Sequence, residues 1–196
     1  MHREHPEVKA FQSKGHENDL KSNIIAKLPM IFFKEKPDNK DYITIMGRLD
    51  NERVSMFIQR SYINVVKNLD SYKIFLPKAS GVGEFGEALA PAIIAMPGVG
   101  HTETFFSIGN FSTLQEAENL LKYLKSRFAR ALLSILKKTQ MITPSNFKFI
   151  PLQDFTPNSD INWSASIRDI DQQLYKKYGL SQQEIDFIES HVKEMA

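Results

Sequence analysis

The apolar residues between positions 41 and 111 follow the short patterns of β-strands. Residues 42–46 and 54–58 are rich in β-branched and aromatic side chains, and they flank the turn sequence Asp50-Asn51-Glu52. This arrangement predicts a β-hairpin. Glycines and prolines separate further strand-like runs, which predicts additional strands at 72–76, 92–95 and 104–108.

Residues 113–136 carry the pattern of one long amphipathic helix. Thr113 and Glu116 have the spacing of a capping box, in which each side chain accepts a hydrogen bond from the backbone amide of the other. Apolar residues then recur every three or four positions, which predicts about six turns with one buried stripe. The other positions include basic residues, which form either a solvated surface or a track for phosphates. They are Lys122, Lys125, Arg127, Arg130, Lys137 and Lys138.

The C-terminal part is predicted to combine loops with two short helices. An extended piece at 147–151 precedes a loop that carries Trp163. A helix over 170–178 ends at Gly179, because glycine favours the left-handed closing conformation, and a second helix begins with the capping box Ser181 to Glu184. The sequence therefore predicts an α+β fold: a twisted, mostly antiparallel sheet, one long packing helix and a small C-terminal helical tail over 165–196.

Residues 1–40 are polar and charged around a single apolar run at 31–33. We expect a partly ordered N-terminal arm here and one domain over 41–196. Residues 1–18 lack the apolar stretch of a secretory signal. The longest apolar stretch, 88–97, contains two prolines and is shorter than the roughly 20 residues of a membrane helix. We therefore expect a cytoplasmic protein that makes no contact with a membrane.

Composition and charge narrow the functional classes. The 196 residues are 42% hydrophobic and 24% charged, which is typical of a folded globular protein. The absence of cysteine excludes disulfides, thiolate zinc sites, iron–sulfur ligation and cysteine nucleophiles. Residues 1–150 hold 21 basic and 15 acidic residues, whereas residues 151–196 hold 4 and 8. A basic body with an acidic tail suggests a surface that faces a polyanion, with ordinary solvated charge as the alternative.

Residues 81–86 match the G-x-G-x-x-G pattern of dinucleotide-binding loops. That fingerprint must open a helix whose N-terminus faces the pyrophosphate. Here Pro91 follows shortly afterwards, and residues 92–95 look extended. We favour a flexible loop with few side chains, in which the backbone approaches a ligand or another chain closely.

Histidines and carboxylates offer no clear metal site. The five histidines are scattered, and only His101, in a glycine-rich approach to a strand, is a candidate donor to an anion or a base edge. As an acid or base it would need a partner that the sequence does not identify. Asp70 with Lys73, or Glu84 with Glu87, would supply the charges of a two-metal nuclease, but neither pair has the matching strand context.

Several segments, taken together in order and spacing, resemble one protein family. They are 72–81, 100–109, 116–128, 138–140, 149–155 and 174–180. The chain from 41 to 196 is similar to the C-terminal region of bacterial type II (type IIG-like) restriction-modification proteins of the adenine-specific DNA methyltransferase kind. Some of these proteins join methylase and nuclease in a single chain.

The resemblance implies a target recognition domain, which recognises the DNA sequence to be methylated or cut. The family's Asn-Pro-Pro-aromatic motif and its S-adenosylmethionine motif do not occur in this sequence. The resemblance therefore implies a recognition fragment or separate subunit that is non-catalytic by itself and holds no cofactor. S-adenosylmethionine is expected in the missing catalytic domains, with Mg²⁺ as a further candidate cofactor there. The implied partners are double-stranded DNA and a methyltransferase or nuclease domain or subunit.

The resemblance also suggests which side chains contact DNA. Basic residues on the hairpin and the following strand suit phosphates or guanine edges, and glycine-rich loops bring hydrogen-bonding side chains into a groove. The candidates are Arg48, Arg53, Arg60, Lys73, Lys78, Ser80, His101, Thr102 and Lys148. Two alternatives stay open: a restriction endonuclease with an unrecognised metal-dependent active site, and a protein-interaction module that docks onto a methylase.

Overall fold

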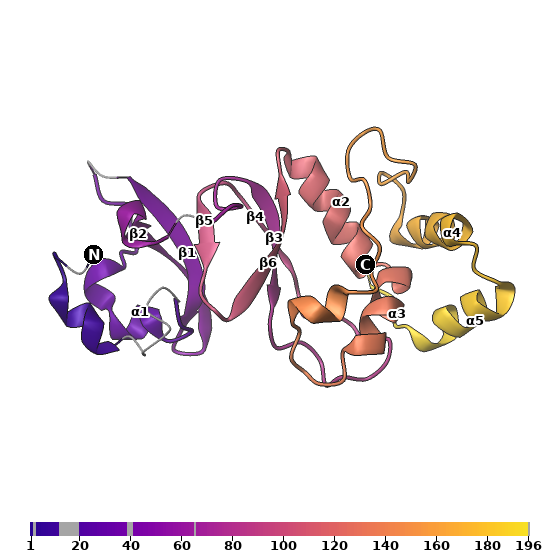
Figure 1. The fold of residues 1–196 in the computed structure, drawn as a ribbon, viewed down its shortest axis with the longest axis horizontal. Helices are drawn as coiled ribbons and strands as arrows, with labels where there is room; N and C mark the ends of the chain where they lie inside the picture. Colours follow the sequence, from indigo (N-terminus) through magenta and orange to yellow (C-terminus); the bar gives the residue numbers. More distant parts are fainter. Residues whose placement is uncertain (2, 12–19, 39–40, 65, 196) are drawn as a thin grey trace.

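The computed structural model describes residues 1, 3–11, 20–38, 41–64 and 66–195. Two three-stranded sheets lie in the middle of an elongated molecule, with the N-terminal segments at one end and helices α2 to α5 at the other (Figure 1). The predicted α+β class is confirmed. The strands, however, form two sheets instead of one.

The first sheet contains the predicted hairpin. Strands β1 (Tyr42–Leu49) and β2 (Glu52–Gln59) are antiparallel, and the short β5 (Val99–His101) runs parallel to β1 on its other side. Asp50 and Asn51 form the two-residue turn with positive φ angles of 50° and 65°. Asp and Asn tolerate this left-handed conformation better than most residues, which explains why the hairpin turns here.

The described N-terminal segments pack against this first sheet. They include a 3-10 helix, η1 (Pro6–Phe11), a short helix, α1 (Ile24–Lys27), and a second 3-10 helix, η2 (Pro29–Ile31). Phe33 exchanges backbone hydrogen bonds with Phe57 of β2 at 2.9 and 2.7 Å. Much of the predicted arm thus belongs to one hydrophobic core with the hairpin, while residues 12–19 and 39–40 lie outside the described residues. The core contains Val8, Ile24, Ile25, Leu28, Ile31, Phe32, Ile43, Ile45, Met56, Ile58 and Leu69.

The second sheet lies between the first sheet and the helices. Its order is β4 (Ile93–Ala95), β3 (Tyr72–Pro77) and β6 (Phe105–Phe111), and all its pairs are antiparallel. Helix α2 (Leu114–Lys125) covers one face. On the opposite face, Phe75 and Phe105 pack with Met46 of β1 and Val99 of β5. Both faces of β3 are therefore buried.

The predicted long helix is wrong in one respect, because it breaks at Ser126. This residue has ψ 147° and separates α2 from α3 (Arg127–Leu136). Asp171, from a distant segment, accepts hydrogen bonds from the amides of Arg127 and Phe128 at 3.0 and 2.9 Å. The Ser126 hydroxyl accepts another from Ala129. These bonds cap a new helix N-terminus in the middle of an unbroken apolar pattern.

The C-terminal helices follow the prediction closely. Helix α4 (Ile167–Tyr178) ends at Gly179 with φ 65°, and α5 (Gln182–His191) begins with the Ser181–Glu184 capping box. The extended piece predicted at 147–151 is wrong: Phe147 is the last residue of a 3-10 helix, η4 (Pro144–Phe147), and residues 148–150 form turns and a bend. A further 3-10 helix, η3 (Arg60–Tyr62), follows β2. Within the described ranges, no helix is both long and apolar enough to cross a bilayer.

Candidate nucleic-acid interface

Two arginines face each other across the β1–β2 hairpin. Arg48 and Arg53 are directly opposed in the strand register, and both are exposed. Like charges in this position repel each other. The Arg53 guanidinium lies 5.3 Å from the centre of the Phe105 ring, and Arg48 donates to the carbonyl of Asn51. Among the described residues, neither arginine forms an ion pair with a carboxylate.

The two arginines line an open cavity of about 270 Å³. Its remaining lining consists of Asn51, Pro77, Thr104 and Phe105, so no acidic side chain of the described part of the chain lines it. Guanidinium groups and an adjacent amide and hydroxyl are the donors that bind phosphate oxygens in proteins. The geometry therefore suits a phosphate or another oxyanion.

A larger cavity of about 570 Å³ lies between the two sheets and shares Phe105 with the first one. Lys78 and His101 both line it. The Nδ1 atom of His101 lies 2.8 Å from the carbonyl oxygen of Thr102 and must donate to it, which leaves Nε2 as an acceptor. Burial lowers the pKa of His101, and the nearby charge of Lys78 lowers it further. His101 is therefore a neutral hydrogen-bonding group at neutral pH, whereas Lys78 supplies the positive charge.

Three predicted DNA contacts are buried in the structure. Lys73 is only 1% exposed, and its Nζ donates to the carbonyls of Leu69, Ser71 and Met96 at 2.9, 2.9 and 3.2 Å. Burial lowers the pKa of Lys73 to about 8. Because its donors are already used inside the protein, Lys73 cannot reach a duplex in this conformation.

Ser80 and Thr102 are buried for a similar reason. The Ser80 hydroxyl accepts a hydrogen bond from the amide of Ala90 at 2.7 Å, and the Thr102 hydroxyl donates to that of Thr104 at 3.1 Å. Both hydroxyls hold loops in place. The predicted contacts of Ser80 and Thr102 with DNA are therefore wrong, because these side chains are buried and have structural roles.

Arg60 and Lys148 lie outside both cavities. Arg60 forms a two-pronged ion pair with Asp70, and its Nε lies 3.9 Å from Asp41. The hydrogen bonds that Arg60 donates to the Asp70 carboxylate raise the pKa of Arg60. Lys148 is exposed after η4, with its Nζ 6.0 Å from the Phe149 ring. Six of the nine predicted residues therefore line the two cavities, because the buried Lys73 and Thr102 also contribute to the larger one. The four of them that are not buried are Arg48, Arg53, Lys78 and His101.

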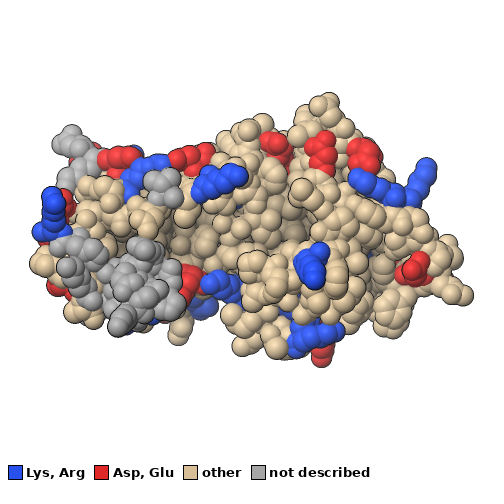
Figure 2. Space-filling view, in the orientation of Figure 1, with Lys and Arg blue, Asp and Glu red and all other residues tan. Residues whose placement is uncertain are grey.

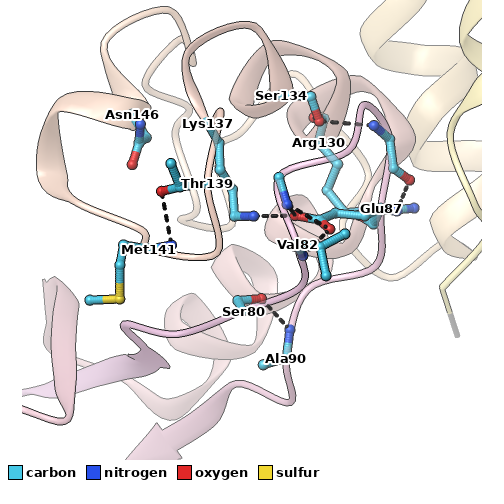
Figure 3. Close-up of polar contacts among 12 residues, drawn as sticks. Ser80, Val82, Glu87, Ala90, Arg130, Ser134, Lys137, Thr139, Met141 and Asn146 are labelled. Atoms are coloured by element: carbon cyan, nitrogen blue, oxygen red, sulfur yellow. Dashed lines mark hydrogen bonds and ion pairs between the residues drawn. The ribbon is translucent and has the colours of Figure 1, made fainter.

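The glycine loop at 81–86 binds the protein's own carboxylate. Glu87 accepts hydrogen bonds from the amides of Val82 and Gly83 at 2.7 and 3.1 Å, and it forms a buried ion pair with Lys137 (Figure 3). Burial alone would raise the pKa of Glu87, but the bonds from Lys137, Val82 and Gly83 outweigh it and lower the pKa. The loop approaches other parts of the same chain: a Cβ on Gly86 would lie 2.3 Å from the carbonyl oxygen of His191.

Most basic residues of the predicted long helix bond backbone carbonyls or carboxylates of the same chain. Lys122 donates to the carbonyls of Trp163 and Ala165 at 2.7 and 3.2 Å, and Arg127 pairs with Glu189. Arg130 is buried and donates to the carbonyls of residues 86, 87 and 193. A phosphate track along this helix is therefore not formed by these residues.

The carboxylates considered for a nuclease site do not form a pair. Glu87 is buried with Lys137, whereas Glu84 is exposed, and Asp70 pairs with Arg60 instead of Lys73. In the part of the chain that the structure describes, no three His, Asp or Glu residues lie close enough to hold a metal ion.

Sequence reasoning identified the arginines but missed Asn51, Thr104 and Phe105, which complete the cavity around them. The hairpin register would have placed Arg48 opposite Arg53, whereas the approach of Phe105 depends on how the two sheets pack. On the face shown in Figure 2, basic and acidic residues are interspersed. No family model, curated protein or solved structure matches this chain.

Proposed function

We propose that this chain binds double-stranded DNA through the cavity between Arg48 and Arg53 and is non-catalytic by itself. The opposed pair of arginines, with no carboxylate between them, is the observation that carries the proposal. A phosphate bound between two guanidinium groups would relieve their repulsion and accept hydrogen bonds from both. Contacts of this kind supply much of the affinity of proteins for DNA.

The second cavity supplies the hydrogen-bonding groups that sequence recognition requires. Lys78 can donate to the acceptors of guanine, and the neutral His101 can accept from an amino group of cytosine or adenine. Phe105 lines both cavities, so the cavity of these two residues adjoins the one that Arg48 and Arg53 line. Phosphate contacts position a protein on DNA, and base contacts give specificity.

The sequence resemblance extends this proposal to a biological setting. We propose that the chain is the target recognition domain of a type II restriction-modification enzyme of the adenine methyltransferase kind. S-adenosylmethionine and the reacting adenine would then be held by a separate catalytic domain or subunit. In this setting the present chain binds the duplex beside the modified base.

The proposal is tested by fluorescence anisotropy with a labelled duplex at low salt. Replacing both arginines (Arg48→Ala with Arg53→Ala) is expected to weaken binding about tenfold to a hundredfold, because each lost phosphate contact costs about 1 kcal/mol. Arg168→Ala with Lys176→Ala, at exposed positions on α4, is the matched control. Equal affinity of the hairpin variant and the wild type would contradict the proposal, as would absence of binding at millimolar protein.

The endonuclease alternative has a separate test. Purified protein is incubated with supercoiled plasmid and Mg²⁺, with and without a chelator. Under our proposal the plasmid stays intact. Cleavage that the chelator abolishes would replace the non-catalytic role with a nuclease activity.

A further inference from the structure

One edge of strand β6 has no neighbouring strand among the described residues. It is the last strand of the order β4-β3-β6, and its pairing with β3 is regular from Phe105 to Ile108. Lys78 donates to the carbonyl of Thr104 at 3.0 Å, which fixes the alternation of the ladder. By this alternation the N–H and C=O groups of Ser107 point away from β3. Outside the ladder, no backbone group of a described residue bonds them. The Asn68 side chain donates to the Ser107 hydroxyl at 3.1 Å and to the carbonyl of Gly109 at 3.0 Å, so the open stretch of this edge is centred on the backbone of Ser107.

A cavity lies on each face of the sheet at this edge. The cavity of about 570 Å³ lies toward the first sheet, and another, of about 380 Å³, lies toward α2. Phe106, Ser107 and Pro144 line both. Successive side chains of a strand point to opposite faces of its sheet. A strand added to β6 would therefore direct its side chains alternately into the two cavities.

The two cavities differ in chemistry. The one toward α2 is lined mainly by apolar and aromatic residues, among them Tyr123, Phe147 and Leu152, and Leu152 is 93% exposed. The one toward the first sheet contains Lys78, which forms no ion pair among the described residues. Glu103 also lines this cavity, but its carboxylate accepts a hydrogen bond from the amide of Ser22 at 3.3 Å.

We propose that the free edge of β6 binds an extended peptide segment of a partner protein, in which apolar side chains alternate with acidic ones. The backbone of the segment would pair with Ser107, its apolar side chains would enter the cavity beside Leu152, and an acidic side chain would face Lys78. Addition of a strand to an open sheet edge is a general mode of peptide recognition. This site goes beyond DNA binding and uses the backbone of Ser107, but it shares Lys78 and the larger cavity with the proposed DNA interface, so peptide and duplex are expected to compete for that cavity.

The test uses the peptide Thr-Val-Glu-Val-Glu-Val-Thr as the probe. Amide hydrogen exchange of the full chain is followed by NMR with and without the peptide. The Ser107 amide is expected to exchange rapidly in the free protein and about tenfold more slowly with saturating peptide. The same peptide with lysine in place of glutamate is expected to bind about tenfold more weakly, because it opposes Lys78 with like charge.

Two variants test the contacts separately. Leu152→Asp places a charge at the mouth of the apolar cavity and is expected to weaken peptide binding about tenfold. Met30→Asp, at an exposed position that lines neither cavity, is the matched control and should bind as the wild type does. Ser107→Pro removes the donor and should abolish binding. If Ser107→Pro fails to fold, Leu152→Asp and the exchange of the wild type still decide the question.

Three results would overturn the proposal. The first is slow exchange of Ser107 in the free protein at all concentrations, which would mean that the chain itself covers the edge. The second is protection that rises with protein concentration together with dimer formation, which would make a second copy the occupant. The third is no protection by the peptide at millimolar concentration. Leu152→Asp should bind DNA normally and the double arginine variant should bind the peptide normally, so failure of either proposal is separable from failure of the other.

Discussion

The hairpin tip and the glycine loop both carry closely spaced charges, but the charges of the loop are buried and paired, whereas those of the hairpin tip are exposed and of like sign. In the glycine loop, the Glu87 carboxylate is surrounded by two amides and the Lys137 ammonium inside the protein. At the hairpin tip, Arg48 and Arg53 face each other and an open cavity without a carboxylate. The loop matches a dinucleotide-binding pattern in the sequence, yet the anion that its amides bind is supplied by the chain itself.

This difference separates charges that stabilise the fold from charges that remain available to a ligand. Removing one partner of a buried, fully hydrogen-bonded ion pair mainly lowers the stability of the fold, because the other charge stays buried without a partner. An exposed pair of like charges contributes little to stability, so its removal should mainly affect binding. Mutations in the two regions are therefore expected to give different phenotypes.

The largest expected effect is the loss of the Glu87 carboxylate. Glu87→Ala leaves Lys137 buried without its partner and two amides unbonded, which is expected to lower the free energy of unfolding by about 3–5 kcal/mol. Urea unfolding measures this cost. Glu87→Leu combined with Lys137→Met removes both charges and should be less destabilised than the single variant. A single variant as stable as the wild type would show that the loop does not need its anion.

A smaller loss is expected where the loop meets the C-terminus. Gly86 has φ 69°, and an added Cβ would lie 2.3 Å from the carbonyl oxygen of His191 and 2.7 Å from the Cα of Val192. Gly86→Ala should cost about 3 kcal/mol, from conformation and overlap together. Gly98 has φ 77° but nothing near its Cβ position, so Gly98→Ala should cost only about 1 kcal/mol. Thermal unfolding of the two variants compares them, and equal costs would contradict this account of the close contact.

At the hairpin tip, the effect should appear in binding instead of stability. Arg53→Lys keeps the charge but loses the planar guanidinium next to Phe105, and we expect duplex affinity to fall about twofold to fivefold. Chemical denaturation should show almost no change. Unaltered affinity would mean that only the charge of Arg53 matters and that its position over the ring does not.

The weakest expected effect is a change in pH dependence. In the folded protein the pKa of Glu87 lies below its ordinary value of 4.5, so its contribution to stability is complete above pH 4.5 and is lost as the pH falls through the folded pKa. The free energy of unfolding should therefore fall more steeply below pH 4.5 in the wild type than in Glu87→Gln. Parallel pH profiles would show that the carboxylate is not held ionised by the loop.

Local features of the fold were predictable from sequence, and long-range features were not. The Asp50-Asn51 turn and the caps at Thr113 and Ser181 depend on neighbouring residues, and all three form as predicted. The break at Ser126 depends on Asp171, which is 45 positions away in the sequence. No local sequence pattern predicts that Asp171 will bond the amides after Ser126.

The candidate site shows the same limit. Lys73 was a candidate DNA contact because it is a basic residue on the strand that follows the hairpin. In the structure the first sheet covers that face, so Lys73 is buried and bonds backbone carbonyls. Arg48 and Arg53 stayed exposed because they lie at the end of the hairpin, beside the turn. The exposure of a charged side chain therefore depended on sheet packing, which the sequence pattern does not contain.

The most direct test of the proposed interface is the salt dependence of duplex binding. Each phosphate contact contributes about −0.9 to the slope of log affinity against log salt concentration. If Arg48 and Arg53 both contact phosphates, the slope for the double alanine variant should be shallower by about two than that of the wild type. An identical slope in the two proteins would contradict the central claim that these arginines bind the DNA backbone.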